Sequence, residues 1–530
     1  MLFTTLSFFI FFGIVLALYY VLPKKWQWVI LLLASFVFYA SFSWKFLFFI
    51  IFTICTVWGA GKWIESISKK TKQAIEENPE IEKEEKKVLK EKAKKHKKLI
   101  IAFTIIVNIG ILAFLKYANF FISNFQGLLS LFGVNQEPLV LNLILPLGIS
   151  FYSFQAVGYL IDVYWGKIEA ENNIFRFALF ISFFPQIIQG PISRYSELGP
   201  QFKEQKKFDL DRIMRGIMLI LFGLVKKLII ADFLANIVNS GFSKVLGLNN
   251  IQALITILSY LVQDYMDFSG CIDIAMGVAE CFGIDLPQNF ERPYFSFTIA
   301  EYWRRWHITL GTWFKDYIFY PISISKFSIK LGKGAKKLFK DSWFAKQIPA
   351  IFGLLVVWLT TGLWHGASWN YVLWGLYYGI LIIASIVFKP LFTKIIEKLK
   401  INVNKWHYKT FQWIRTIILL CLGRIIFRCE SVADIGNFIS ALFNITFKIT
   451  PSMFDLFRVD SNWVPMAVAF GVVFIIDLLK EIKHIDFRKL LVEKSYIATS
   501  AAIIIMMFAV ILFGSYGPGY AVQDFIYMQF

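Results

Sequence analysis

Hydrophobic runs separated by short polar breaks make up most of this 530-residue chain. Each run is about 17 to 25 residues long, which is the length that an α-helix needs to cross the hydrocarbon core of a bilayer. The pattern predicts an all-α, polytopic integral membrane protein with roughly 11 to 13 transmembrane or re-entrant helices. The expected spans lie at 2–22, twice within 26–61, and around 144–165, 174–190, 212–240, 250–266, 271–284, 349–388, 411–427, 463–479 and 497–514.

Composition supports the membrane class, because 57% of the residues are hydrophobic and only 17% are charged. A soluble protein of this length would need a more polar surface. No internal repeat and no second domain stand out, so we expect one membrane-embedded domain over residues 1–530. The five cysteines form no CxxC pair and have no histidine at metal-ligand spacing, which indicates neither a disulfide framework nor a metal site.

The positive charge is concentrated in two polar segments. Residues 62–98 contain 13 lysines and 8 glutamates among helix-forming residues, with Pro79 as the one break. We expect a charged helical loop there and a basic loop at 326–346, which contains seven lysines. Lysine-rich loops face the cytoplasm in membrane proteins, so both loops are predicted to be cytoplasmic, and the N-terminus and the 133–142 break to be external. The net charge of +19 therefore does not indicate nucleic-acid binding.

The first polar segment at membrane depth is 183–194, in which Pro185, Gly190 and Pro191 interrupt a strongly apolar stretch around Gln186. Backbone groups freed by such a break must be satisfied by protein or by water that lines a cavity. A simple end of a span before the polar residues that follow explains the local sequence equally well.

Three carboxylates, Asp264, Asp267 and Asp273, lie in an otherwise apolar pair of predicted helices. A charge inside a span is costly unless it has a partner or lines a water-filled cavity. We expect Asp267, and Asp316 further along the chain, to pair with nearby arginines.

A second polar segment follows, where Thr298 and the glutamate three residues later have the spacing of a capping box. This spacing predicts a helix that places Trp303 and His307 on one face, four residues apart, with Arg304 and Arg305 turned aside. The alternative is an interfacial helix whose tryptophans and arginines lie at the lipid headgroups.

The third polar segment contains two GxxxG spacings, Gly362/Gly366 and Gly375/Gly379, which let another backbone approach closely. His365 lies within the first spacing, in an aromatic setting that we expect near the middle of a span. A histidine inside the membrane is a candidate functional residue. A structural histidine bonded to a neighbouring helix is an equally open interpretation.

Of the five histidines, only His307 and His365 lie among aromatic, membrane-depth motifs; the other three lie in lysine-rich segments. A neutral imidazole can take a proton from a hydroxyl and return it to a leaving group, and a second imidazole can orient or polarise, so the pair suits acyl transfer. The chain has no GxSxG elbow, HExxH pair, Walker A loop or dinucleotide fingerprint, which weakens hydrolase, protease, ATPase and dehydrogenase interpretations.

These motifs resemble the membrane-bound O-acyltransferase family, and most closely its bacterial branch of alginate O-acetylation proteins. The resemblance covers nearly the whole chain, and its Trp-Arg-Arg-Trp-His and Leu-Trp-His-Gly-Ala segments are specific. The matching stretches are 183–194, 264–273, 289–294, 302–320, 362–379, 427–428 and 525–530. Two positions, Tyr378 and Met528, depart from the residues common in close relatives and leave the acceptor open.

The resemblance implies a helical fold around a central funnel, in which His365 and His307 meet as the catalytic pair. His365 would be the general base, and His307 would orient or polarise the acetyl carbonyl. Further residues near these motifs are candidates for substrate binding; they are Arg304, Arg305, Trp303, Trp306, Asp316, Asp267, Trp364, Ser368, Asn370 and Gln186.

The resemblance also implies a bacterial plasma-membrane enzyme that binds no cofactor and takes its acetyl group from a cytosolic thioester, acetyl-CoA. The expected partners are membrane lipid, a polysaccharide or cell-wall glycan acceptor and an exported esterase-like O-acetyltransferase. One alternative is the related branch that passes D-alanine from a carrier protein towards teichoic acid. Another is a transporter, since broken helices and buried carboxylates also occur in that class.

Overall fold

A computed structural model of the chain describes residues 1–134, 137–340, 342–444 and 463–517. Within these ranges the secondary structure is helical apart from one isolated β-bridge, which confirms the all-α prediction. Contacts divide the chain into two compact units, Met1–Gly216 with Val278–Pro287 and Ile217–Gly277 with Gln288–Phe530. We call them unit 1 and unit 2 and describe each by itself.

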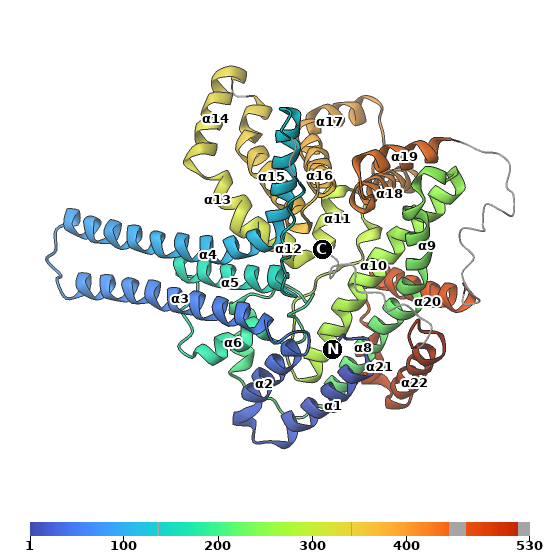
Figure 1. Ribbon diagram of the computed structural model, residues 1–530, viewed down its shortest axis with the longest axis horizontal. Coiled ribbons are helices and arrows are strands. Elements are labelled where there is room, and N and C mark those ends of the chain that lie inside the picture. The colour runs from blue at the N-terminus through green and yellow to red at the C-terminus, as the bar shows by residue number, and fades with distance from the viewer. Residues whose placement is uncertain (135–136, 341, 445–462, 518–530) are drawn as a thin grey trace. The chain divides into compact units, whose positions relative to one another are not determined.

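Unit 1 contains the N-terminal helices of Figure 1, which are α1 (Leu6–Val21), η1 (Lys24–Trp26), α2 (Gln27–Ala40), α3 (Phe46–Glu76), α4 (Lys83–Leu131), α5 (Ile149–Trp165), α6 (Ile174–Ser182), α7 (Tyr195–Leu198) and η2 (Pro200–Phe202). Side-chain caps begin two of them, because Thr5 accepts a hydrogen bond from the amide of Phe8, and Asn173 accepts one from that of Phe175. Helices α8 (Leu210–Leu224) and α10 (Asn250–Cys281) contribute to both units.

Unit 2 continues with the helices that follow, which are η3 (Val225–Ala231), α9 (Asp232–Ser243), η4 (Val245–Gly247), η5 (Pro293–Phe295), α11 (Ile299–Arg305), α12 (Ile308–Phe314), η6 (Lys315–Phe319), α13 (Tyr320–Ser323), α14 (Lys326–Phe339), α15 (Trp343–His365), α16 (Trp369–Val387), α17 (Lys389–Lys398), α18 (Trp406–Arg428), α19 (Val432–Phe443), α20 (Trp463–Lys483), α21 (Phe487–Lys494) and α22 (Tyr496–Phe513). Two of these elements, η3 and η6, are π-helical turns.

Seven helices of the described ranges are long and apolar enough to cross a membrane, namely α3, α4, α15, α16, α18, α20 and α22. Two shorter apolar helices, α1 and α19, accompany them. This pattern agrees with a polytopic membrane protein. The 26–61 stretch forms the two predicted helices, α2 and α3, with Lys45 directly before α3.

The charged segment 62–98 is a helical hairpin made by the end of α3 and the start of α4, which lie side by side (Figure 1). The turn between them contains Pro79, as the sequence predicts. At 1.5 Å per residue, the 49 residues of α4 extend about 73 Å, more than twice the roughly 30 Å hydrocarbon core of a bilayer. The lysine-rich part of α4 therefore extends well past its apolar part.

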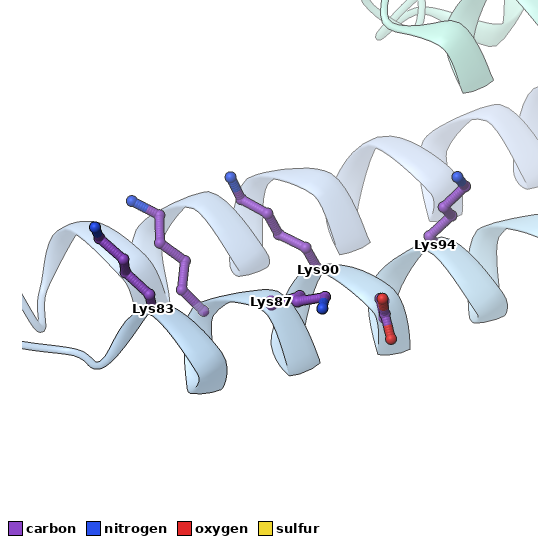
Figure 2. A pocket seen from close by; sticks show the side chains of 6 residues that line it. Lys83, Lys87, Lys90 and Lys94 are labelled. Atoms are coloured by element: carbon purple, nitrogen blue, oxygen red, sulfur yellow. The ribbon is translucent and has the colours of Figure 1, made fainter.

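Lysines line a shallow hollow on this hairpin, shown in Figure 2. Lys83, Lys87, Lys90 and Lys94 project from successive turns of α4, and Glu91 is the one acidic residue that lines the same hollow. These positions recur every three or four residues, so they form one basic stripe along the helix. Such a stripe is suited to an aqueous surface.

The break predicted at 183–194 is non-helical and lies inside the protein. Helix α6 ends at Ser182 and α7 begins at Tyr195, and nearly every residue between them is buried. Gly190 is required there, because a Cβ at this position would overlap the backbone of Gln186. The segment is therefore a buried break and not the exposed end of a span.

The predicted pair of spans at 250–266 and 271–284 is wrong, because one continuous helix, α10, covers both. Gly270, which lies between the two predicted spans, packs against Gly223 of α8, where a Cβ on either residue would overlap the other backbone. This close approach brings Nζ of Lys226 to within 2.7 Å of the Asp273 carboxylate. It also brings Nζ of Lys227 to within 2.5 Å of the Asp267 carboxylate.

The two GxxxG spacings have the predicted role, and the backbone that approaches is that of the next helix. Gly362 of α15 and Gly375 of α16 face each other, and a Cβ on either one would overlap the facing backbone. Helices α15 and α16 therefore form a tight hairpin. The segment expected as a basic loop at 326–346 is also largely helical, because α14 occupies most of it.

Candidate functional site

The segment that leads to His307 begins with the predicted cap. Thr298 accepts a hydrogen bond from the amide of Glu301 at 3.1 Å, and the Glu301 carboxylate accepts one from the amide of Phe297 at 3.0 Å. Helix α11 starts here but ends at Arg305, before His307.

The prediction that Trp303 and His307 share a helical face is therefore wrong. Trp306 forms an antiparallel bridge with Phe290, and His307 has a φ of 46° as the residue before α12. A tertiary pairing of two extended segments thus ends the helix that the local spacing predicts to continue. It also turns His307 into the protein.

His307 is 3% exposed, and its ring lies in a polar and aromatic setting. Its Nδ1 is 3.2 Å from Oδ1 of Asn289, and the Phe268 ring packs edge to face against it at 4.9 Å between centroids. His307 lies outside the seven candidate spans, and burial lowers the pKa of its imidazole to about 3. The ring is therefore neutral at physiological pH.

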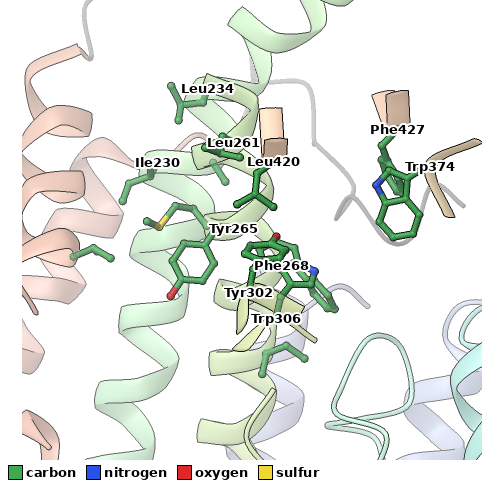
Figure 3. Packing of buried hydrophobic residues seen from close by; sticks show 14 of the residues in the cluster. Ile230, Leu234, Leu261, Tyr265, Phe268, Tyr302, Trp306, Trp374, Leu420 and Phe427 are labelled. Atoms are coloured by element: carbon green, nitrogen blue, oxygen red, sulfur yellow. The ribbon is translucent and has the colours of Figure 1, made fainter. Parts of the chain in front are cut away.

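His365 is the last residue of α15, which corrects the expectation that it lies near the middle of a span. The backbone leaves the helical conformation at the following residue, Gly366, and Ser368 caps the next helix, α16. The imidazole is 3% exposed and packs edge to face against Trp374 at 4.7 Å and Phe427 at 5.3 Å. Figure 3 shows Trp374 and Phe427 beside each other.

One indole joins the two histidines. The ring of Trp364 lies 6.0 Å from that of His307 and 4.8 Å from that of His365, and it is itself buried. The structure therefore gathers both histidines and Trp364 in one aromatic, buried region of unit 2. We call it the histidine site.

A buried aromatic cluster borders the histidine site. Trp303 packs against Trp374 and Tyr378, and Trp306 stacks on Tyr302 at 5.5 Å. Figure 3 shows Tyr302 and Trp306 close to Phe268. The predicted site residues Trp303 and Trp306 thus belong to the wall that surrounds the histidines.

A buried ion pair supports this wall. Arg424 of α18 lies 2.5 Å from Asp264, donates to the Tyr302 hydroxyl at 2.8 Å and places its guanidinium over the Trp306 ring at 4.6 Å. Both charged side chains are almost completely buried. Because Arg424 touches both Tyr302 and Trp306, it fixes the residue directly before His307.

The other predicted charged residues have different partners. Arg305 pairs with Glu301 at 2.8 Å and with Glu481 at 2.9 Å, whereas Arg304 is exposed. Asp267 pairs with Lys227, and the aspartate that pairs with an arginine is Asp264, one turn earlier.

Several candidate residues hold the backbone in place. Ser368 caps α16, and Asn370 donates a hydrogen bond to the carbonyl of Cys429. Gln186 lies in unit 1, where its amide donates to the Phe180 carbonyl and accepts from Ser193. Asp316 lies partly buried in the π-helical turn η6. A role for these four residues in substrate binding stays a prediction.

Sequence reasoning missed three residues of the site, Asn289, Trp374 and Arg424. Asn289 and Arg424 stand far from the histidines in the sequence, and only the folded chain brings them to His307 or its neighbour Trp306. The available signal for Arg424 was its place within the apolar part of α18, since a charge there needs a buried partner.

The fold and the histidine site together define a class of protein: a helical membrane enzyme with two buried imidazoles suited to proton transfer and no group of metal ligands in the described ranges. The model of the membrane-bound O-acyltransferase family matches residues 170–428, which include both histidines. A protein named probable alginate O-acetylase AlgI from Pseudomonas syringae pv. tomato is 32% identical over 82% of this chain and 74% of its own length.

Two further relatives differ in their named acceptors. The peptidoglycan O-acetyltransferase of Helicobacter pylori is 33% identical over 64% of this chain and 63% of its own length. The teichoic acid D-alanyltransferase of Bacillus subtilis is 32% identical over 45% of this chain and 58% of its own length.

The chain belongs to the membrane-bound O-acyltransferase family, and it is a multi-pass O-acyltransferase of a bacterial membrane. The predicted family resemblance is confirmed. The matching stretch 525–530, which includes Met528, lies outside the residues that the structure describes.

Proposed function

We propose that this protein takes an acetyl group from acetyl-CoA on the cytoplasmic side of the membrane and passes it on for O-acetylation of an extracytoplasmic polysaccharide or cell-wall glycan. The relatives named alginate O-acetylase and peptidoglycan O-acetyltransferase support this acceptor class. The observation that carries the proposal is the burial of His307 and His365 against the indole of Trp364.

In the proposed reaction His365 is the general base. Its imidazole takes the proton of the acceptor hydroxyl while the hydroxyl oxygen bonds to the thioester carbonyl carbon. The carbon–sulfur bond then breaks, and the proton passes to the leaving thiolate. His307 orients the reacting groups or polarises the carbonyl, and the aromatic wall excludes water that would hydrolyse the thioester.

The proposed donor is a substrate and no resident cofactor is required. The exposed Arg304 and the lysines of 326–346 would attract its phosphates, because positive charge at a membrane surface concentrates anionic ligands. The acceptor that receives the acetyl group is either the glycan itself or an exported esterase-like partner that hands it on.

A test uses the purified full-length protein in lipid nanodiscs with labelled acetyl-CoA and a glycan acceptor. We expect acetyl transfer, and we expect His365→Ala to reduce it about 10²- to 10⁴-fold, the range for loss of a general base. His407→Ala is the matched control, because His407 is exposed on α18. Full transfer by His365→Ala at equal protein level would show that His365 is not the base.

The D-alanylating relative supplies the one alternative that a specific observation favours. The same nanodiscs supplied with a D-alanyl carrier protein distinguish the two donors by which thioester is consumed. Consumption of the D-alanyl thioester alone would overturn the acetyl assignment while leaving O-acyl transfer intact.

A further inference from the structure

The side chain of Asn289 has one orientation that its neighbours permit. Its Oδ1 lies 3.1 Å from the backbone nitrogen of Thr309 and 2.9 Å from the Thr309 hydroxyl. A backbone N–H can only donate, so the asparagine atom that faces it must be the oxygen and not the amide nitrogen. A flipped amide would place two donors against each other.

The same oxygen faces His307. Nδ1 of the ring is 3.2 Å from Oδ1 of Asn289, and a carbonyl oxygen has no proton to give. The contact is favourable only when Nδ1 carries the hydrogen. We infer that Asn289 is a positioning residue that holds neutral His307 as its Nδ1–H tautomer, which leaves the lone pair on Nε2.

The backbone shows that this contact belongs to a rigid arrangement. The Asn289 carbonyl accepts the amide of Ile308 at 2.9 Å, and the Arg305 carbonyl accepts the amide of Glu291 at 2.9 Å. These two bonds lie on either side of His307, whose left-handed backbone would otherwise be unfavourable for a residue with a side chain. Asn289 thus holds the turn with its backbone and the ring with its side chain.

Packing restricts the ring further. Phe268 and Trp364 both approach the imidazole edge to face, and Asn289 itself is fully buried. Burial also keeps the ring neutral, so one ring proton is present and its location decides what the ring can do.

The Nδ1–H tautomer limits which of the two proposed roles, orienting or polarising, His307 can have. This step rests on the proposed function. A neutral Nδ1–H imidazole accepts a hydrogen bond at Nε2 and cannot donate one there. His307 therefore orients a hydroxyl or amide N–H of the bound substrate, and it does not polarise the thioester carbonyl as a donor. Of the two roles proposed for His307, orientation is the one that the tautomer allows.

The direct test is a long-range ¹H–¹⁵N spectrum of the full-length protein, labelled with ¹⁵N-histidine, in nanodiscs near neutral pH. His307→Gln identifies the His307 signals by their loss. We expect a protonated Nδ1 and an unprotonated Nε2 for His307. The opposite pattern in the unsubstituted protein, with Nε2 protonated and Nδ1 unprotonated, would overturn the inference.

Three variants separate the tautomer effect from a general structural effect. Asn289→Ala removes the acceptor and should mix the tautomers, whereas Asn289→Asp retains an oxygen and should keep Nδ1 protonated. Thr309→Val is the matched control, because it removes a different hydrogen bond to the same oxygen and leaves the histidine contact in place. An unchanged Nδ1–H pattern in folded Asn289→Ala would also overturn the inference.

Kinetics give a second readout. Asn289→Ala should lower kcat about 10- to 100-fold, by analogy with the loss of the hydrogen-bond partner of a metal-bound histidine, and Asn289→Asp should be closer to the unsubstituted enzyme. The spectrum does not depend on activity. Full activity of His365→Ala would contradict the role of His365 as base but would not affect the tautomer inference. A spectrum with Nε2 protonated would contradict the tautomer inference but would not affect the proposed acetyl transfer.

Discussion

The ion pair between Arg424 and Asp264 is a buried constraint on the wall of the histidine site. Both side chains are almost completely buried, so each charge depends on the other for its stabilisation. The arginine also contacts Tyr302 and Trp306, which connects the pair to the residue before His307.

We expect Arg424→Met to destabilise the protein by about 3–5 kcal/mol, because it leaves the Asp264 carboxylate buried without its cation. Thermal unfolding in detergent, followed by loss of the monodisperse peak, measures the effect. The double variant Arg424→Met with Asp264→Leu should lose much less stability than the single variant. Equal losses in both would mean that the unpaired charge is not the cause.

Single residues also show how far sequence reasoning reaches. His307 and His365 could be chosen because they are the two histidines outside lysine-rich segments. The surroundings of these histidines could not be predicted, because the contact between Asn289 and His307 depends on a pairing of extended segments that no local spacing encodes. Ser368 and Asn370 are candidates because they lie near the motif of His365, and the structure shows both in hydrogen bonds with backbone groups.

At the scale of elements, ends of helices position the two histidines. His365 is the last residue of α15, and His307 directly precedes α12. The GxxxG spacing predicted the close α15–α16 packing because it is a local pattern with a direct steric meaning. The capping box predicted where α11 starts, but the bridge between Phe290 and Trp306 decides where it ends.

The α15–α16 hairpin gives a steric prediction. Gly375→Ala should destabilise the protein by about 1–3 kcal/mol, because its Cβ would overlap the backbone carbonyl of Trp358 and force the helices apart. Acetyl transfer should fall with it, since Trp358 and Trp374 lie beside the site. Thermal unfolding and the transfer assay measure the two effects.

Gly334→Ala is the matched control for this prediction. Gly334 lies in α14 with open space around it, so alanine there should be neutral or slightly stabilising. If Gly375→Ala and Gly334→Ala have the same unfolding temperature, the close approach of α15 and α16 is not required for stability.

At the scale of the whole molecule, the lysine-rich hairpin predicts how the chain lies in the membrane. Glu80→Cys, in the turn between α3 and α4, should react with a membrane-impermeant maleimide only from the cytoplasmic side. Glu137→Cys should react only from outside. Labelling of intact cells and of inverted vesicles separates the two faces, and the protein without an added cysteine gives the background.

Labelling of Glu80→Cys in intact cells would reverse the predicted orientation. Labelling of both cysteines from one side would instead mean that the apolar part of α4 does not cross the membrane. The sequence makes this prediction from the lysine excess, which is a local property of two segments. The sequence predicts two spans where the continuous helix α10 lies, and only the folded chain shows Gly270 of this helix packed against Gly223.

The paired charges of η3 and α10 have a consequence for how the chain enters the membrane during synthesis. Lys226 and Lys227 of η3 pair with Asp273 and Asp267 of α10. Each such charge costs roughly 2.5 to 3.5 kcal/mol at the centre of an isolated inserting helix. The stretch around η3 leaves the ribosome first, so Lys226 cannot pair with Asp273 until α10 has been made, whereas Lys227 also lies 2.9 Å from Asp232, which follows it closely in the chain. We therefore expect the Lys226–Asp273 pair to favour entry of the two segments into the membrane together.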